Sequence, residues 1–228
     1  MPEILLHQWE ISPFCGKIRA ILRHKGLSFQ VRNYNGLLAR KAAALTPAGT
    51  LPVLDYDGQR VAESSAIAAF LEQRHPEPAL LPADPEARAR VRVWEDWADE
   101  SLYWLEIYSR FSDPEATRKA ATMLCEGRPT FERTLLLPLL SQVYRRKLKT
   151  QGLGRLARED VEAKLFGHLD DLETLLSKSP WLVGDTASLA DIAAAAQLRE
   201  IIRTSPLRPR IEQRKAVVDW IERALPTD

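Results

Sequence analysis

Cysteine and long apolar runs are scarce in this chain of 228 residues. Its two cysteines, Cys15 and Cys125, are too few and too far apart to suggest a disulfide framework, and no charged-then-apolar leader opens the chain. A reducing, cytoplasmic location is therefore expected. No apolar run approaches the roughly 20 residues that span a bilayer, so we expect no membrane association.

The chain also lacks an excess of either charge and lacks clustered metal ligands. The formal net charge is +1, which gives no general attraction for nucleic acid, and the basic run 145–149 is interpreted as a solvated helix end. The four histidines are widely separated and show no metal spacing, so no metal site is predicted. No Gly-rich phosphate loop is present either. What is present is the composition of an ordinary globular protein, with 45% hydrophobic and 28% charged residues.

A proline-rich stretch divides the chain. Residues 76–85 contain four prolines, which is typical of a linker, and we predict one domain over 1–78 and a second over 85–228. Before the linker, apolar periodicity predicts the order βαβαββα, over residues 3–9, 13–25, 28–34, 37–45, 51–55, 59–62 and 64–75. After it the pattern predicts only helices, over residues 85–111, 113–149, 158–178, 189–205 and 212–224. The predicted fold class is α/β followed by all-α.

The sequence Ser12-Pro13-Phe14-Cys15 lies between an apolar run and an amphipathic helical segment. Proline is favoured at the first helical position, which makes Ser12 the N-cap. Because a helix N-terminus carries positive potential, a thiolate is stabilised at such a turn. The segment therefore indicates either a reactive site or a simple helix cap, and Cys15 is either a buried apolar residue or a thiol that meets a ligand.

The domain order and the Ser-Pro-Phe-Cys turn together resemble the glutathione transferases over nearly the whole chain. The resemblance implies a thioredoxin-like domain that binds glutathione as cosubstrate, and a helical domain that holds a small apolar electrophile. In serine-type members, the hydroxyl at the Ser12 position donates a hydrogen bond to the glutathione sulfur and favours its thiolate. Phe14 is counted among the glutathione-binding residues. Cys15 matches the second cysteine of a thioredoxin-like pair, which leaves a mixed disulfide at Cys15 as an alternative chemistry.

The resemblance assigns further glutathione contacts to Leu51 and Pro52. In the family this proline is cis and turns the backbone of the preceding residue toward the cysteinyl part of glutathione, where it pairs as a short strand would. Many members have lysine at the position of Thr50, where it helps hold the glycyl carboxylate. This chain lacks that lysine, and Arg40 or Lys41 are candidates to replace it.

Glu63 and Ser64 stand where a predicted strand ends and a helix begins. A helix N-terminus with a hydroxyl binds a carboxylate well. By resemblance to the family's acidic-Ser motif, Ser64 holds the γ-glutamyl carboxylate and Glu63 pairs with the ammonium beside it. Further along, Ser188 and Asp191 have the spacing of a capping box, to which we assign a structural role rather than a chemical one.

The electrophile pocket is the least readable part of the chain. Aromatic residues recur at helical spacing between 94 and 111, a pattern more typical of core packing, and Trp104 and Tyr108 are the candidates to line a pocket. The long segment 113–149, interrupted by Gly127-Arg128-Pro129, is larger than a minimal family member needs. It either extends the pocket or carries a partner surface.

Three functions are consistent with these features. The first is a transferase that activates glutathione for attack on a small apolar electrophile, acting through Ser12. The second is a glutathione-dependent thiol transferase or reductase acting through Cys15. The third is a non-catalytic binding or regulatory protein with a decayed site, which Thr50 favours. The resemblance also implies a two-fold homodimer.

Overall fold

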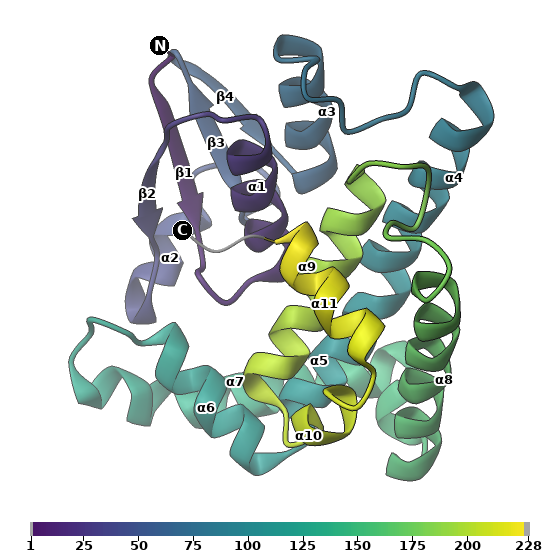
Figure 1. Ribbon diagram of the computed structural model, residues 1–228. Helices are drawn as coiled ribbons and strands as arrows, with labels where there is room; N and C mark the ends of the chain where they lie inside the picture. The colour runs from purple at the N-terminus through teal and green to yellow at the C-terminus, as the bar shows by residue number, and fades with distance from the viewer. Residues whose placement is uncertain (1, 226–228) are drawn as a thin grey trace.

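The computed structural model describes residues 2–225 (Figure 1). Its N-terminal domain contains the elements β1 (Ile4–Gln8), α1 (Pro13–His24), β2 (Gln30–Asn33), the 3-10 helix η1 (Gly36–Leu38), α2 (Ala39–Ala42), β3 (Val53–Tyr56), β4 (Gln59–Ala62) and α3 (Ser64–Arg74). The predicted order βαβαββα is confirmed. The strands form one mixed sheet in the order β2-β1-β3-β4, with β1 parallel to β2 and antiparallel to β3.

The sheet and α1 carry the core of this domain. Leu6 of the central strand β1 and Leu54 of β3 are fully buried, as are Ile18 and Ile21 of α1. Figure 1 shows α1 between the sheet and helix α9 of the C-terminal domain. Because α1 packs against both domains, its N-terminus lies where the two domains meet.

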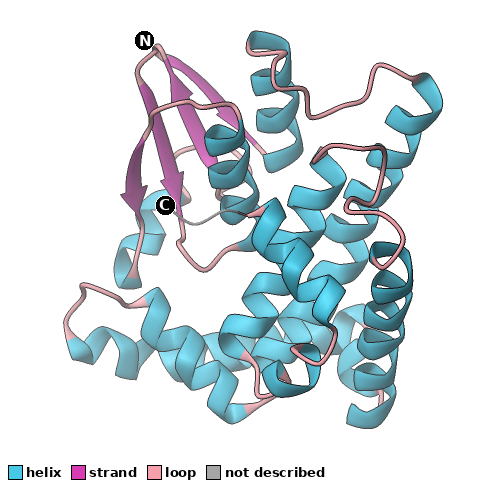
Figure 2. Cartoon of the chain, in the orientation of Figure 1, coloured by secondary structure: helices cyan, strands magenta, loops and turns pink. Residues whose placement is uncertain are grey.

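The C-terminal domain is helical, with all strands confined to the other end of the molecule (Figure 2). Its elements are α4 (Pro85–Asp96), the π-helical η2 (Trp97–Leu102), α5 (Tyr103–Phe111), α6 (Pro114–Leu124), α7 (Thr130–Gln151), the 3-10 helix η3 (Leu153–Arg155), α8 (Arg158–Leu176), α9 (Leu189–Thr204), α10 (Arg208–Ile211) and α11 (Lys215–Ala224). Among the described residues, no helix is both long enough and apolar enough to span a membrane.

Two predicted helix ranges need correction, and one helix was missed. The predicted helix 85–111 passes through a π-helical segment, η2, between α4 and α5. The predicted segment 113–149 is two helices, because Gly127 adopts a φ of +70° and Pro129 begins the next helix as its N-cap. The short helix α10 was not predicted at all, since four residues are too few to show a helical period.

The capping box at the start of α9 is confirmed and is part of the core. Asp191 is fully buried, and its two oxygens accept hydrogen bonds from the Ser188 amide at 2.9 Å, the Ser188 hydroxyl at 2.7 Å and the Leu182 amide at 2.9 Å. Trp220 of α11 donates its indole N–H to the same carboxylate at 2.8 Å. Asp191 therefore joins α9, α11 and the preceding loop, as expected for a structural residue.

Helices α6 and α7 reach back to the N-terminal domain. The turn between them and the first turn of α7 lie against the connection between β2 and α2 (Figure 1). Asn35 donates its side-chain amide to the Glu126 carbonyl at 2.9 Å, and the Leu37 amide donates to Glu132 Oε2 at 2.8 Å. Gly36, between them, has a φ of +59° and leaves no room for a Cβ, which would lie 2.0 Å from Glu132 Oε2.

Candidate active site

Ser12 is the N-cap of α1, as the sequence predicts. Its backbone is extended, Pro13 occupies the first turn, and its hydroxyl oxygen accepts a hydrogen bond from the Cys15 amide at 3.4 Å. Because the oxygen acts as the acceptor in this cap, the cap itself does not use the hydroxyl proton, which lies within reach of the Cys15 thiol and of the space in front of the helix. The half-buried Ser12 thus presents an O–H donor at the positive end of a 12-residue helix.

Cys15 lies one turn further along α1 and is fully buried. Burial raises the pKa of its thiol to about 11, although the Ser12 side chain and the Trp9 backbone partly offset the shift. The thiol is therefore protonated at neutral pH and has no open approach. Both properties oppose nucleophilic chemistry at Cys15.

Leu51 and Pro52 are joined by a cis peptide bond, in agreement with the expectation from the family. Pro52 is buried and immediately precedes β3, while Leu51 is half-buried. Within residues 2–225, the backbone amide and carbonyl of Leu51 form no hydrogen bond. These two groups are the ones expected to pair with the backbone of glutathione.

Glu63 and Ser64 stand at the start of α3. Glu63 has a φ of +71°, an unusual conformation for a residue with a side chain, and is exposed. Ser64 is the first residue of the helix and is 8% exposed. Thr50, at the position where the family often has lysine, donates its hydroxyl to Glu63 Oε1 at 2.9 Å. Thr50, which precedes Leu51, and Glu63, which precedes Ser64, are therefore in direct contact.

Arg40 and Lys41 remain exposed on the short helix α2. Neither forms a salt bridge with another described residue. Their side chains are therefore free to meet a ligand carboxylate, and their role stays a prediction.

A buried lysine that sequence reasoning missed ties α1 to the helices around it. Lys17 is 1% exposed and forms ion pairs with Glu95 at 2.6 Å and Asp99 at 2.8 Å, and it also donates to the Ser65 hydroxyl at 3.4 Å. Burial raises the pKa of Asp99, although Lys17 partly offsets the shift. The cluster fixes the helix that begins after Ser12 against the helix that begins at Ser64.

The aromatic candidates Trp104 and Tyr108 lie four residues apart on α5, only about 40° from each other around the helix, yet they have different neighbours. Phe14 contacts Tyr103 with ring centroids 5.0 Å apart, and Tyr103 contacts Trp104 at 5.3 Å. Trp104 is thus next to the ring that reaches the Ser-Pro-Phe-Cys turn. Tyr108 lies about 140° around the helix from Tyr103 at 100° per residue. Only a pocket near Phe14 suits an electrophile that meets a sulfur at Ser12, which favours Trp104.

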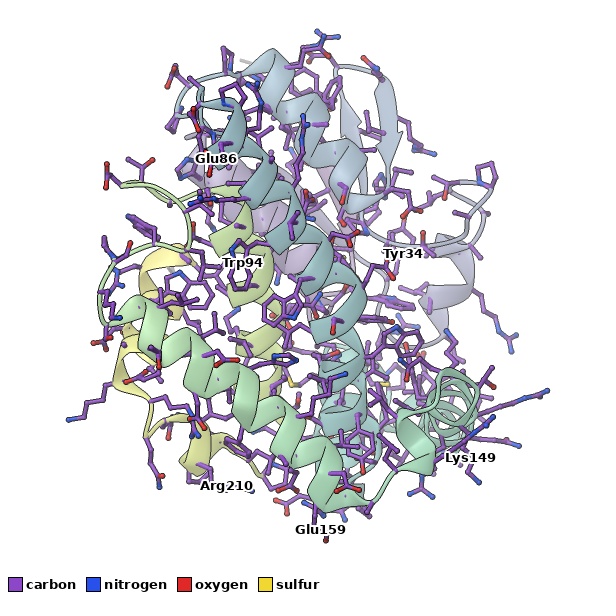
Figure 3. All side chains as sticks on the ribbon, turned by 90° about the vertical axis from the view of Figure 1, so that its right-hand side faces the viewer. Tyr34, Glu86, Trp94, Lys149, Glu159 and Arg210 are labelled. Carbon is purple, nitrogen blue, oxygen red and sulfur yellow. The ribbon has the colours of Figure 1, made fainter. Side chains whose placement is uncertain are left out.

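Tyr108 instead lines an open groove of about 850 Å³ between α5 and α7. The groove also contains the cations Arg145, Arg146 and Lys149, from the basic run that the sequence marks as a helix end. Figure 3 shows Lys149 at the outer edge of the helical domain, away from Tyr34, which borders the sheet. The basic run is thus partly a groove wall as well as a helix terminus.

No metal site accompanies these residues. Within the part of the chain that the structure describes, no group of three or more His, Cys, Asp or Glu side chains is arranged to hold a metal ion. Near Ser12 the described residues supply a hydroxyl, a helix N-terminus and buried charges.

Two family models match the chain in sequence. The model described as "Glutathione S-transferase, N-terminal domain" matches residues 6–79, and "Glutathione S-transferase, C-terminal domain" matches residues 155–223. Helices α6 and α7 lie between the two matched regions.

Individual proteins match as well. Protein LigF from Sphingobium is 31% identical over 150 residues, which are 65% of this chain and 58% of LigF, so the chain spans less than two thirds of that relative. FtsZ-localized protein A from Caulobacter vibrioides is 31% identical over 208 residues, covering 87% of this chain and 77% of the relative.

A glutathione S-transferase from Methylobacterium radiotolerans, solved in complex with glutathione sulfonate, has a TM-score of 0.59 at 25% identity and covers 99% of this chain and 96% of that chain. Both family models thus match in order on the observed fold, and a relative is 31% identical over most of its length. This chain therefore belongs to the glutathione S-transferase family.

Proposed function

We propose that this protein activates the thiol of glutathione for attack on a small apolar electrophile, with Ser12 as the hydrogen-bond donor to the sulfur. The observation that carries the proposal is the contrast within one turn of α1. Ser12 presents a hydroxyl at the helix N-terminus, whereas Cys15 is buried with a raised pKa. The reactive sulfur is therefore that of the ligand.

In the proposed reaction, glutathione lies across the N-termini of α1 and α3. Its cysteinyl backbone pairs with the free amide and carbonyl of Leu51, next to the cis bond to Pro52. Its γ-glutamyl carboxylate accepts from Ser64 at the start of α3, and its ammonium pairs with the exposed Glu63. Phe14 borders the sulfur from the side of Tyr103.

The chemical step is a nucleophilic attack by the bound thiolate. The Ser12 hydroxyl donates to the sulfur and lowers the pKa of the thiol, and the N-terminus of α1 adds positive potential. The thiol proton is released to solvent, a sulfur–carbon bond forms, and the electron pair leaves with the leaving group or is protonated after addition. No covalent bond to the enzyme is needed. A hydrogen bond to a charged group contributes about 1.5–3 kcal/mol, so its loss reduces the rate about 10- to 100-fold.

Ser12→Ala and Cys15→Ala distinguish this mechanism from its alternative. We expect Ser12→Ala to reduce conjugation sharply and Cys15→Ala to spare it, with activity measured on chlorinated aromatic, epoxide, peroxide, disulfide and aryl ether substrates. The aryl ether is included because LigF, one of the relatives in sequence, is described as a beta-etherase. The reverse result moves the chemistry to Cys15 and a mixed disulfide.

A non-catalytic binding protein is the remaining candidate, and FtsZ-localized protein A is a relative named for its localisation rather than for a reaction. Calorimetry with millimolar glutathione decides between these classes. We expect binding; no heat of binding at that concentration would favour the non-catalytic protein.

Following the family, we further propose a two-fold homodimer in the cytoplasm, with the N-terminal domain of one chain against the C-terminal domain of the other. Sedimentation equilibrium tests the oligomeric state. A monomer at micromolar concentration contradicts it.

A further inference from the structure

A network of buried charges from the C-terminal domain lies against the backbone that leads into Ser12. Arg110 of α5 is 4% exposed and donates a hydrogen bond to the Ile11 carbonyl at 3.1 Å. The same guanidinium forms ion pairs with Glu106, one turn earlier, and with Glu200 of α9 at 3.4 Å. An arginine from the second domain thus holds the residue immediately before the candidate catalytic serine.

A second arginine contacts the same turn directly and is joined to Arg110 by Glu200. Arg203 pairs with Glu200 Oε1 at 2.8 Å and with Glu10 Oε2 at 2.9 Å. Glu200 is fully buried and therefore joins the two arginines. Arg19 of α1 adds a third contact, donating to the Glu10 carbonyl at 2.9 Å. Glu10 and Ile11 are both held by guanidinium groups.

The turn itself is short and has few other supports. Its main-chain closure is one hydrogen bond, from the Ser12 amide to the Trp9 carbonyl at 3.1 Å, and the Trp9 indole donates to the Tyr34 carbonyl at 2.9 Å. Arginines from α1, α5 and α9 thus add three directional contacts to residues 10 and 11, and two of these arginines come from the C-terminal domain.

Simple packing does not account for this arrangement. Placing two carboxylates and an arginine out of water costs several kcal/mol per ion before their attraction is counted, and apolar side chains of similar volume stabilise a core at least as well. Hydrogen bonds to a backbone carbonyl fix direction as well as distance, which apolar contacts do not. The arrangement is suited to holding one backbone segment in one orientation.

We propose that Arg110 is a positioning residue for thiol activation, holding the Ile11 carbonyl so that the Ser12 hydroxyl points at the glutathione sulfur. Glu200 and Arg203 of α9 support this arrangement, because Glu200 pairs with both arginines and Arg203 also pairs with Glu10. The proposal rests on the proposed function of Ser12. Loss of Arg110 is expected to weaken the hydrogen bond to the sulfur while leaving the contacts at Leu51, Glu63 and Ser64 in place.

Arg110→Met is the direct test, and Lys25→Met is its matched control. Lys25 is also a buried cation, paired with Glu72 at 2.7 Å and donating to the carbonyls of His75 and Pro78, and it lies at the other end of α1. Both variants lose a buried ion pair and are expected to lower the melting temperature. Only Arg110→Met should disturb Ser12.

Two measurements separate positioning from stability. The ultraviolet absorbance of bound glutathione, titrated with pH, should show a thiol proton dissociation constant about tenfold weaker in Arg110→Met, with kcat down about 10- to 100-fold and the glutathione Kd within about twofold. Hydrogen exchange of the amides in residues 9–16 should accelerate in Arg110→Met and not in Lys25→Met. Arg110→Lys, which keeps one donor and the charge, should recover part of both effects.

The proposal is overturned if Arg110→Met shows the same thiol pKa of bound glutathione and the same hydrogen exchange as the wild type. It is also overturned if Lys25→Met changes these two quantities as much as Arg110→Met does. If Arg110→Met does not fold, Glu10→Gln replaces it, since this carboxylate is about a third exposed and the change removes the charge that pairs with Arg203. Wild-type protein that binds glutathione without ionising it contradicts the proposed function instead, and the exchange measurement still decides whether Arg110 orders the turn.

Discussion

The Thr50 hydroxyl donates a hydrogen bond to Glu63 Oε1 at 2.9 Å. This contact links the two segments expected to hold opposite parts of glutathione, and it occurs at the position where the family often has lysine. The hydroxyl keeps the Glu63 carboxylate beside the start of α3, where the ligand ammonium is expected.

Thr50→Val removes this hydrogen bond at nearly constant volume. Both residues are exposed, so the bond contributes only about 1 kcal/mol to holding the carboxylate. We expect the glutathione Kd to rise about fivefold, by calorimetry, with kcat nearly unchanged. Thr50→Ser keeps the hydroxyl and is the control. Equal affinities for Val and Ser would show that the contact plays no part in binding.

Glu106 should make stability depend on pH. Burial raises the pKa of this carboxyl to about 7 in the folded protein, although Arg110 partly offsets the shift, whereas an unfolded glutamate titrates near 4.3. Between these values the folded state binds more protons than the unfolded state, so this group reduces stability as pH rises from about 4.3 to 7. Ionising Glu106 should cost up to about 4 kcal/mol.

Glu106→Gln removes that titration. Relative to the wild type, its free energy of unfolding should improve between pH 5 and pH 8, measured by urea denaturation at each pH. A constant difference between the two proteins across this range would mean that Glu106 keeps one protonation state.

Asp191→Ala should destabilise the protein without direct effect on thiol chemistry. The carboxylate accepts from Ser188, Leu182 and Trp220, and its removal leaves buried donors unpaired at about 1–3 kcal/mol each. We expect a loss of about 3–5 kcal/mol in the free energy of unfolding. Ser188→Ala removes a single hydroxyl contact and should cost less. An unchanged melting temperature together with lost activity would show that Asp191 acts in the reaction and not in folding.

Gly36→Ala tests the docking of α7 on the N-terminal domain. The φ of Gly36 is +59°, and a Cβ there would strike Glu132. Gly58→Ala is the matched control, because its φ is +80° but nothing lies within 4 Å of the added Cβ. Both changes carry a backbone cost of about 1 kcal/mol.

Only Gly36→Ala should also break the contact between Leu37 and Glu132. We expect faster proteolysis in the turn 125–129 and a lower melting temperature than Gly58→Ala gives. Equal proteolysis rates and equal melting temperatures of the two variants would indicate that the start of α7 shifts to accept the added Cβ at no cost in stability.

Local patterns account for what was predictable. Pro13 after Ser12 marks the start of α1, and Ser188 with Asp191 marks the start of α9, because caps are short-range signals. The order of strands and helices follows from apolar periodicity in the same way. Leu51, Pro52, Glu63 and Ser64 came from resemblance to a family, and the cis bond agrees with it.

Contacts across the domain boundary were not predictable. Arg110 is 99 positions from Ile11, and Lys17 is 78 from Glu95, so no local pattern pairs them. Helical periodicity placed Trp104 and Tyr108 on one stripe, but it carries no information on which partner each face meets. One face of α5 contacts Phe14 through Tyr103. The neighbouring face, with Tyr108, lines the groove between α5 and α7.

The carboxylate of Glu132 serves as the partner of a backbone amide in the other domain. Residues 35–37 therefore cannot change length or shape without a matching change near residues 126–132. In a set of homologues, these two stretches should vary in concert, and grafting one without the other should lose the junction. Engineering of the connection between β2 and α2 is in effect engineering of two loops at once.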